Sequence, residues 1–245
     1  MNKNYTVFHL HTDLSNPFTT LDSVTKFEMY IERAKELGMT AMAFSEHGNM
    51  LHWVKKKLAI ENAGMKYMHA IETYVTANLE NKIRDNHHVV LIAKNIEGVK
   101  ELNKMHSADT SFNKKDGHNY YNPRISFDEL INTSENIIIT TACLGGILWG
   151  ENEIKDDFIS FLSKNKHRCF LEIQHHLVDD QITYNKELYE LNQKYGIPLI
   201  AGTDTHSLNE DYAEGREVLQ KSKKIHFDNE DGWDLTFKSY EELVE

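Results

Sequence analysis

Short apolar runs alternate with amphipathic stretches along almost the whole 245-residue chain. The apolar runs have the length of buried strands, and the amphipathic stretches repeat apolar residues at helical spacing. The predicted strands span residues 5–10, 40–44, 67–75, 88–93, 137–141, 169–173 and 198–202. The predicted helices span residues 21–37, 51–63, 96–108, 154–162 and 181–195. This alternation is typical of parallel strands joined by crossover helices, which makes the chain an α/β protein.

The short connections favour right-handed βα units within one sheet or barrel. About seven units in one domain over residues 1–245 suit a closed β/α barrel, and a doubly wound open sheet is the alternative. The longest predicted loop is the polar stretch 107–126. We find no glycine-rich phosphate loop, so the main signal of a nucleotide-cofactor fold is missing.

The charge balance limits what the surface can bind. Lys and Arg number 27 against 38 Asp and Glu, a net charge of −11, so no global basic field attracts nucleic acid or an anionic membrane. Any polyanion must be held locally. Two cysteines cannot form a disulfide framework, and no apolar run reaches the roughly 18 residues of a spanning helix. With no apolar signal core after Met1, we expect a cytoplasmic protein without a membrane partner.

Side chains that bind metal ions recur where the predicted strands end. They are His9, His11, Glu46, His47, Glu72, Cys143, Asp204 and His206, while His87 and His88 adjoin a strand start. Residues i and i+2 of a strand share a face, so His-x-His and Asp-x-His can each present two ligands together. Each group alone has an ordinary structural explanation, but a barrel brings these ends together. Imidazole, carboxylate and thiolate in one site favour Zn²⁺ or Mn²⁺ over Mg²⁺ or Ca²⁺.

Seven sequence blocks carry a resemblance to a known family. They are FHLHT (8–12), SEHGN (45–49), IETYV (71–75), HVVLIAK (88–94), ACLGG (142–146), LEIQ (171–174) and TDTH (203–206). In this order they resemble the PHP (polymerase and histidinol phosphatase) domains, most closely the N-terminal PHP domain of bacterial DNA polymerase III alpha subunits. The resemblance covers nearly the whole chain. Residues 232–239, within a tail of about 222–245, resemble the connection to the polymerase body.

The resemblance implies a distorted (β/α)₇ barrel with up to three ions, Zn²⁺ and/or Mn²⁺, at the C-terminal ends of the strands. His9, His11 and Asp204 would bind one ion, and Glu72 would bridge it to a second ion held by His88 and Cys143. Asp22, His47 and His206 would hold the third, with Asp13 as a rival to Asp22. Glu46 replaces the family's usual Asp and is expected to support the ligands rather than bind an ion.

The implied function is that of a metal-dependent phosphoesterase, most directly a proofreading-type 3′-to-5′ exonuclease acting on DNA. The substrate would be a DNA 3′ end, bound weakly by this acidic chain alone, and a DNA polymerase or replication protein would be its partner. One alternative is a small-molecule phosphatase of the histidinol-phosphatase type. The other is a non-catalytic, metal-stabilised interaction module of a polymerase assembly. The residues identify no general acid beyond the metal cluster.

Overall fold

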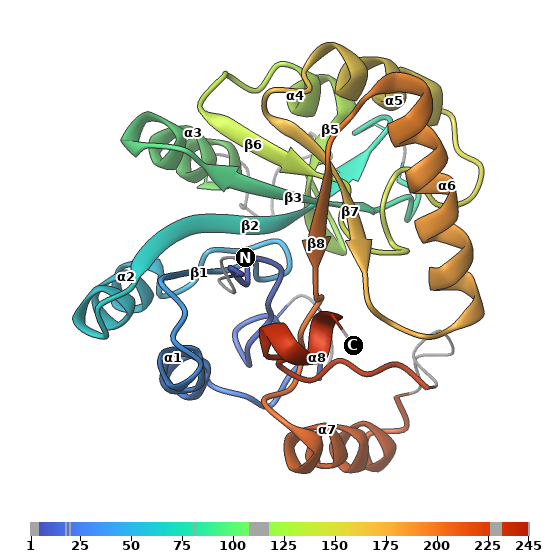
Figure 1. Cartoon of the computed structure of the whole chain (residues 1–245). Coiled ribbons are helices and arrows are strands. Elements are labelled where there is room, and N and C mark those ends of the chain that lie inside the picture. The colour runs from blue at the N-terminus through green and yellow to red at the C-terminus, as the bar shows by residue number, and fades with distance from the viewer. Residues whose placement is uncertain are drawn as a thin grey trace.

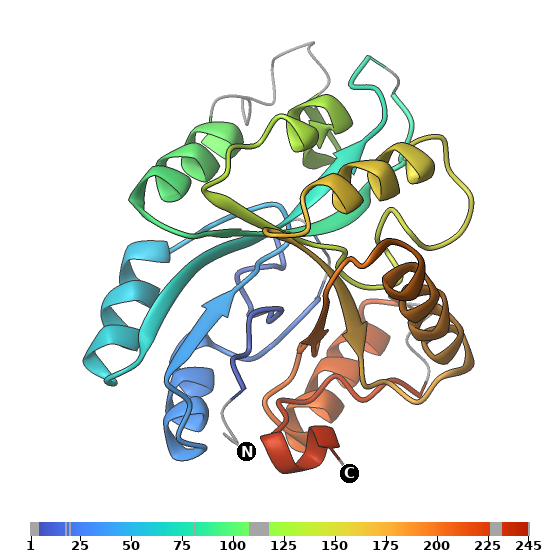
Figure 2. The same cartoon turned by 45° about the horizontal axis from the view of Figure 1, so that its top comes forward.

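A curled mixed sheet forms the centre of the protein, and helices line its outer side (Figure 1; Figure 2). The computed structural model describes residues 5–17, 19, 21–80, 82–107, 118–225 and 232–244. The strands are β1 (Ala41–Phe44), β2 (Lys66–Thr76), β3 (His87–Ala93), β4 (Asn119–Tyr120), β5 (Asn122–Ser126), β6 (Ile137–Thr140), β7 (Cys169–Gln174) and β8 (Leu199–Gly202). The helices are α1 (Phe27–Glu36), α2 (Trp53–Asn62), α3 (Ile96–Ser107), α4 (Phe127–Ile131), α5 (Lys155–Lys164), α6 (Asp179–Tyr195), α7 (Glu210–Ser222) and α8 (Tyr240–Val244).

The strands follow the order β4-β5-β2-β3-β6-β7-β8, and β1 pairs with the first part of β2. Most neighbours are parallel, as predicted, but β3 runs antiparallel to both β2 and β6. The prediction that all strands are parallel is therefore wrong for β3. Because β3 is reversed, its first residues lie at the edge where the other strands end, and His88 pairs with Tyr74 of β2.

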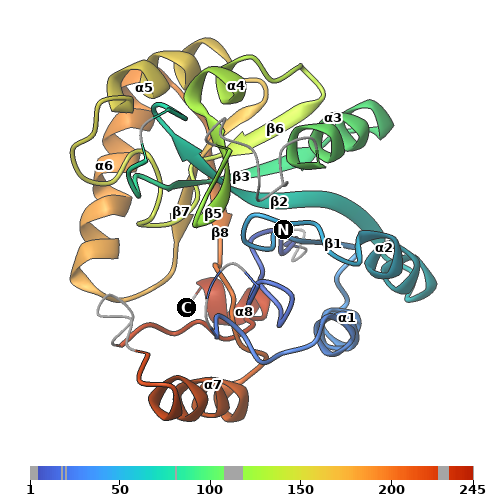
Figure 3. The same ribbon diagram turned by 180° about the vertical axis from the view of Figure 1, so that it is seen from behind.

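The first predicted strand, 5–10, closes the curl without forming a continuous strand. Val7 forms an isolated bridge to Met42 of β1, and Leu10 forms one to Thr205 beyond β8. The N–H of Ala43 donates to the carbonyl of Val7 at 2.9 Å, and that of His11 donates to Thr205 at 2.8 Å. The N-terminal segment thus lies inside the curve, between β1 and the end of β8 (Figure 3). This closure confirms a distorted barrel rather than a doubly wound open sheet.

Two other predicted elements differ from the structure. The helix predicted over 21–37 begins only at Phe27, because the polar residues before it form a hydrogen-bonded turn in which Asn16 Oδ1 accepts from the N–H groups of Asp22 and Ser23. The predicted loop 107–126 contains β4 and β5, while its residues 108–117 lie outside the described residues. Helices α4, α7 and α8 were not predicted.

Most buried core residues lie in a larger and a smaller part, and a third, minor cluster includes Phe8, Ala70 and Val90. The larger part packs β2, β3, β6 and β7 against the helices around them, with Leu91, Ile139 and Leu171 completely buried. The smaller part joins the N-terminal segment, α1, β1 and α2 around Tyr30, whose ring centroid lies 5.6 Å from that of Phe237. The C-terminal segment is therefore packed into the domain. Among the described residues, none of the helices combines the length and apolarity required to span a bilayer.

Candidate metal centre

The structure brings all nine predicted ligands together in one cluster at the edge where the sheet's parallel strands end. They come from seven places in the fold: the N-terminal segment, the turn before α1, the loop after β1, β2, the start of β3, and the loops after β6 and β8. In chain order they are His9, His11, Asp22, His47, Glu72, His88, Cys143, Asp204 and His206. All are buried except His88, whose side chain is 21% exposed. Because β3 runs in the opposite direction, His88 at its start lies beside the ligands that follow the C-terminal ends of the other strands.

Glu72 lies at the centre of the cluster. Its Oε1 is 3.3 Å from His9 Nε2 and 3.0 Å from His88 Nδ1. Its Oε2 is 3.2 Å from His11 Nε2 and 2.8 Å from His47 Nδ1. Two oxygens that face different imidazoles suit a carboxylate shared between two ions.

Asp204 lies close to three histidines of the cluster. Its Oδ1 lies 3.1 Å from His9 Nε2, 3.3 Å from His11 Nε2 and 3.2 Å from His206 Nε2. Two ligands at about 2.0–2.1 Å from a tetrahedral ion are separated by roughly 3.3 Å, close to these spacings. His9, His11 and Asp204 thus have the separations of ligands around one ion.

Asp22 faces the remaining histidines. Its Oδ1 lies 3.1 Å from His206 Nδ1 and 3.5 Å from His47 Nε2. Asp13 makes no hydrogen bond or ion pair with the cluster in the described part of the chain; its backbone N–H donates to Thr25. The grouping is less separate than the resemblance implies, because ligand atoms of His11, His47 and His206 also converge, as do those of His47, Glu72 and His88.

Cys143 completes the side of the cluster next to β3. Its Sγ lies 3.6 Å from His88 Nδ1 and 4.0 Å from Glu72 Oε1. Burial raises the pKa of this thiol well above its ordinary value, and the charges of Asp204 and Glu72 raise it further. A cation is what would stabilise the thiolate in such surroundings.

Several buried ligand atoms lack hydrogen-bond partners. Five belong to the predicted ligands: His9 Nε2, His11 Nε2, Asp22 Oδ2, His47 Nδ1 and Glu72 Oε2. Four of the five lie 2.8–3.3 Å from another ligand atom of the cluster without hydrogen-bond geometry, a spacing that suits ligands converging on an ion. Divalent ions would satisfy these donors, and the N, O and S donor set fits Zn²⁺ or Mn²⁺.

The titrating groups show how strongly the cluster is coupled. Burial alone would lower the pKa of His9, but Glu172, Asp204 and Glu72 raise it well above its ordinary value. Burial would lower that of His206 too, yet Asp22 and Asp204 raise its pKa to about 10. Without ions, histidine protons offset the buried carboxylates. Bound cations would take over that role and leave the imidazoles neutral.

A buried carboxylate that the sequence analysis did not assign supports His9. Glu172 of β7 has its Oε1 2.5 Å from His9 Nδ1, and its other oxygen accepts from Thr140 Oγ1 at 2.5 Å. Gly202 makes room for it, because a Cβ at that position would lie 2.0 Å from Glu172 Oε1. The sequence feature that could have identified Glu172 is its place inside the apolar run 169–173, since a carboxylate is rarely buried without a partner.

Glu46 supports the ligands through Ser15. Its carboxylate accepts from Ser15 Oγ at 2.6 Å, from Thr12 Oγ1 at 2.6 Å and from the buried Lys56 at 2.5 Å. Burial would raise the pKa of Glu46, but Lys56 and these donors lower it. Ser15 Oγ in turn lies 3.2 Å from His11 Nδ1. With Nδ1 held by the hydroxyl, the Nε2 lone pair of His11 is left for the cluster.

Three non-glycine residues at or beside predicted ligands have positive φ. They are Leu21 at 57°, Ala142 at 55° and Asp204 at 45°. Such backbone geometry persists where surrounding contacts enforce it. At Leu21 these contacts come from α7: Gln220 Nε2 donates to the Leu21 carbonyl at 3.0 Å, and Arg216 Nε donates to the Asp22 carbonyl at 2.5 Å.

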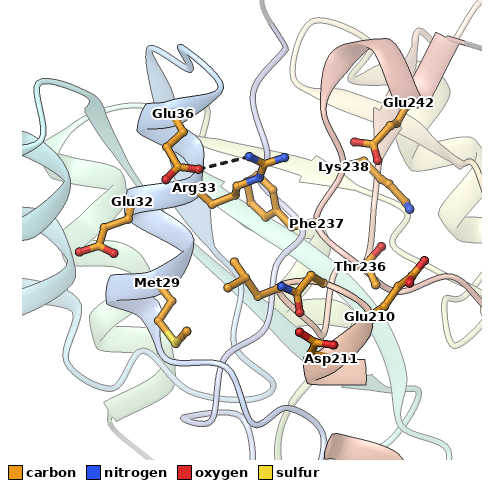
Figure 4. Close-up of a pocket in the computed structure, with 12 residues that line it drawn as sticks. Met29, Glu32, Arg33, Glu36, Glu210, Asp211, Thr236, Phe237, Lys238 and Glu242 are labelled. Carbon is orange, nitrogen blue, oxygen red and sulfur yellow. Dashed lines mark hydrogen bonds and ion pairs between the residues drawn. The ribbon is translucent and has the colours of Figure 1, made fainter. Parts of the chain in front are cut away.

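A pocket of about 600 Å³ lies between α1, the start of α7 and residues 236–242 (Figure 4). Its charged groups include Arg33, which is paired with Glu36, and Lys238, which is paired with Asp234. None of the described residues that line it is a predicted ligand. The chemistry of the cluster is therefore separate from this pocket.

Comparison with known proteins identifies relatives of the chain. The model of the PHP domain family matches residues 8–176. DNA polymerase III subunit alpha of Aquifex aeolicus is 33% identical across 92% of this chain and 20% of that protein, and its counterpart in Borreliella burgdorferi is 31% identical across 86% and 19%. The chain thus spans about a fifth of the length of these curated relatives. A solved structure from Bifidobacterium adolescentis, assigned as a metal-dependent phosphoesterase, has a similar fold: TM-score 0.56, 12% identity, 100% of this chain and 96% of that one.

Proposed function

Since the chain belongs to the PHP domain family, we propose that it is a metal-dependent phosphoesterase whose substrate is the 3′ end of DNA. The observation that carries this proposal is the buried cluster in which Glu72 faces four imidazoles and five ligand atoms lack hydrogen bonds. The proposed ligands are the nine residues of the cluster, and up to three Zn²⁺ or Mn²⁺ ions are the proposed cofactors.

The protein's own residues would prepare the site. When bound, divalent ions supply positive charge for phosphoryl oxygens and acidify a coordinated water. Glu172 and Ser15 hold His9 and His11 with their Nε2 atoms toward the cluster. The α7 residues Arg216 and Gln220 hold the turn that carries Asp22. A preorganised cluster of this kind needs little rearrangement as charge develops on the reacting phosphate.

DNA is favoured as substrate because curated relatives of the chain are DNA polymerase III alpha subunits. The net charge of −11 gives few phosphate contacts outside the cluster, so we expect weak, salt-sensitive binding by the chain alone. A polymerase that holds the DNA would supply most of the affinity through effective concentration. We accordingly propose that residues 1–245 form one PHP domain and that the tail, about 222–245, leads toward a polymerase body. Residues 226–231 and 245 of this tail lie outside the described residues.

The test combines metal analysis with three substrates. Purified protein is reconstituted with Mn²⁺ or Zn²⁺ and offered a 5′-labelled oligonucleotide, bis(p-nitrophenyl) phosphate and p-nitrophenyl phosphate. We expect shortening from the 3′ end and turnover of the diester, with Asp204→Asn inactive and the exposed-site control Asp157→Asn active. His167, which is exposed and paired with Glu135, provides the corresponding control for His9→Ala.

Each alternative has its own result. Efficient turnover of the monoester with intact DNA ends would replace the nuclease by a small-molecule phosphatase. Metal-loaded protein that hydrolyses none of the three substrates would favour a metal-stabilised interaction module.

A further inference from the structure

A ridge of aromatic and cationic side chains lies beside the metal cluster. The strand β5 pairs with the end of β2, with Arg124 opposite Tyr74, while Tyr74 also pairs with His88 on its other side. The Tyr74 ring lies between two predicted ligands, with centroids 5.9 Å from His47 and 5.1 Å from His88. The hairpin β4–β5 is therefore attached directly to the strand that carries the centre of the cluster.

The loop between β2 and β3 is fixed against this hairpin by a buried arginine. Arg124 donates to the carbonyl of Ile83 at 3.0 Å and to that of Leu79 at 3.3 Å, and it lies 3.7 Å from Asp85. The Asp85 carboxylate in turn accepts from Thr76 Oγ1 at 2.7 Å. These buried contacts hold Leu79, Ile83 and Asp85 against Arg124 of β5.

Arg84, between Ile83 and Asp85, lies over an exposed tyrosine. The guanidinium carbon of Arg84 lies 3.5 Å from the centroid of the Tyr121 ring, and Tyr121 is 64% exposed. Tyr121 has a φ of 65°, which a bulky residue adopts only when the surroundings enforce it. Tyr120 packs edge-on against it, with ring centroids 4.8 Å apart. The result is a preformed ridge of Arg84, Tyr121 and Tyr120, with the neighbouring Ile83 50% exposed.

We propose that this ridge binds single-stranded DNA and directs its 3′ end into the metal cluster. The proposal rests on the function proposed above. Single strands are held by cationic side chains that contact phosphates and by aromatic rings or guanidinium planes on which bases stack. Arg84 offers both, because one face rests on Tyr121 while its N–H groups make no hydrogen bond or ion pair with the described residues. On a chain with net charge −11, such a local site is what a polyanion requires.

The experiment measures binding and turnover separately. Fluorescence anisotropy with labelled oligo(dT) gives the affinity of the metal-loaded protein, and kinetics give KM and kcat on the same oligonucleotide and on bis(p-nitrophenyl) phosphate. For Arg84→Ala and Tyr121→Ala we expect roughly tenfold weaker oligonucleotide binding and a matching rise in KM. The small diester has no strand to stack, so its turnover should be unchanged.

Three further variants make the test specific. Tyr121→Phe keeps the ring under Arg84 and should retain affinity. Tyr189→Ala and Lys100→Ala remove an exposed tyrosine and an exposed lysine on the helices α6 and α3, and should leave affinity unchanged. Loss of Arg84 should also reduce the slope of log affinity against log salt by about 0.7, the value for one phosphate contact on a single strand.

The failures of the two proposals differ. Oligonucleotide affinity and KM that stay at the parent value in Arg84→Ala and Tyr121→Ala would overturn the ridge, whatever the activity. Parent protein that hydrolyses the small diester but binds no oligonucleotide would also overturn it and leave the phosphoesterase in place. If the protein has no hydrolytic activity but its DNA binding still depends on Arg84 and Tyr121, the ridge proposal is supported and the phosphoesterase proposal is wrong.

Discussion

Glu172 Oε1 lies 2.5 Å from His9 Nδ1, and both side chains are completely buried. The other nitrogen of the ring, Nε2, faces Asp204 and Glu72 at 3.1 Å and 3.3 Å. A carboxylate that accepts the Nδ1 proton selects the tautomer whose Nε2 lone pair can bind an ion, and it makes the ring more basic. Glu172 thus acts on the metal centre through His9.

Replacing Glu172 by Gln should weaken metal binding without unfolding the protein. The amide can still occupy the space beside Thr140, but it lacks the charge that orients and polarises His9. Supporting residues of this kind typically contribute 10–100-fold in metal affinity, and isothermal titration calorimetry should show a loss of that size. Glu187→Gln, on the exposed side of α6, is the control. Parent affinity in Glu172→Gln would contradict the supporting role.

Gly202→Ala should destabilise the same contact by steric overlap. A Cβ would lie 2.0 Å from Glu172 Oε1, so the carboxylate or the backbone has to move. We expect a loss of roughly 1–3 kcal/mol in the free energy of unfolding, measured by urea denaturation of the metal-free protein. Gly215→Ala in α7 is the control for an added Cβ that meets no atom within 4 Å, and it should keep or raise the stability because alanine favours a helix. Equal stability of the two variants would show that Glu172 adjusts freely.

Glu72→Gln should remove more metal than His47→Ala. Both Glu72 oxygens face histidines, Oε1 toward His9 and His88 and Oε2 toward His11 and His47, so one substitution disturbs two ion positions. Loss of His47 removes one imidazole and should weaken mainly the position that it would share with Asp22 and His206. Inductively coupled plasma mass spectrometry after reconstitution gives the stoichiometry, and equal metal loss in the two variants would contradict a bridging Glu72.

Asp22→Asn should lower the metal content by one ion, whereas Asp13→Asn should leave it unchanged. Asp22 lies 3.1 Å from His206 and 3.5 Å from His47, and these histidines, acting against its burial, hold the pKa of its carboxyl well below the ordinary value. Asp13 is only partly buried, and its pKa is raised by burial and by the charge of Glu46. The same mass spectrometry decides between them: a metal loss confined to Asp13→Asn would reverse the assignment.

The sequence predicts the barrel because the alternation of apolar runs and amphipathic stretches is strong in most units. The apolar runs 40–44, 137–141 and 169–173 correspond to β1, β6 and β7. Residues 5–10 form only isolated bridges, since their partners change from Met42 on one side to Thr205 on the other within four residues. The direction of β3 could not be predicted either, because a buried strand has the same apolar pattern whether it is parallel or antiparallel to its neighbours.

Spacing predicts pairs of ligands but not the residues that support them. His9 with His11 and Asp204 with His206 could be found because alternate residues share a face. Glu172 and Ser15 act through tertiary contacts to His9 and His11, and Arg216 reaches Asp22 across 194 positions of the chain. Such contacts leave no periodic signal in one sequence. The ridge of Arg84 and Tyr121 is hidden for the same reason, because Arg124 positions it from another strand.

The most direct measurement is the length of a 5′-labelled, single-stranded oligonucleotide incubated with Mn²⁺-loaded protein at low and high salt. The proposed function predicts stepwise shortening from the 3′ end, slowed strongly by salt and abolished in Asp204→Asn, whose fold is checked by circular dichroism. Added polymerase partner should speed the reaction. An oligonucleotide that stays intact with the fully metal-loaded, folded parent protein, under conditions in which phosphate monoesters are hydrolysed or no phosphoester reacts, would contradict the nuclease.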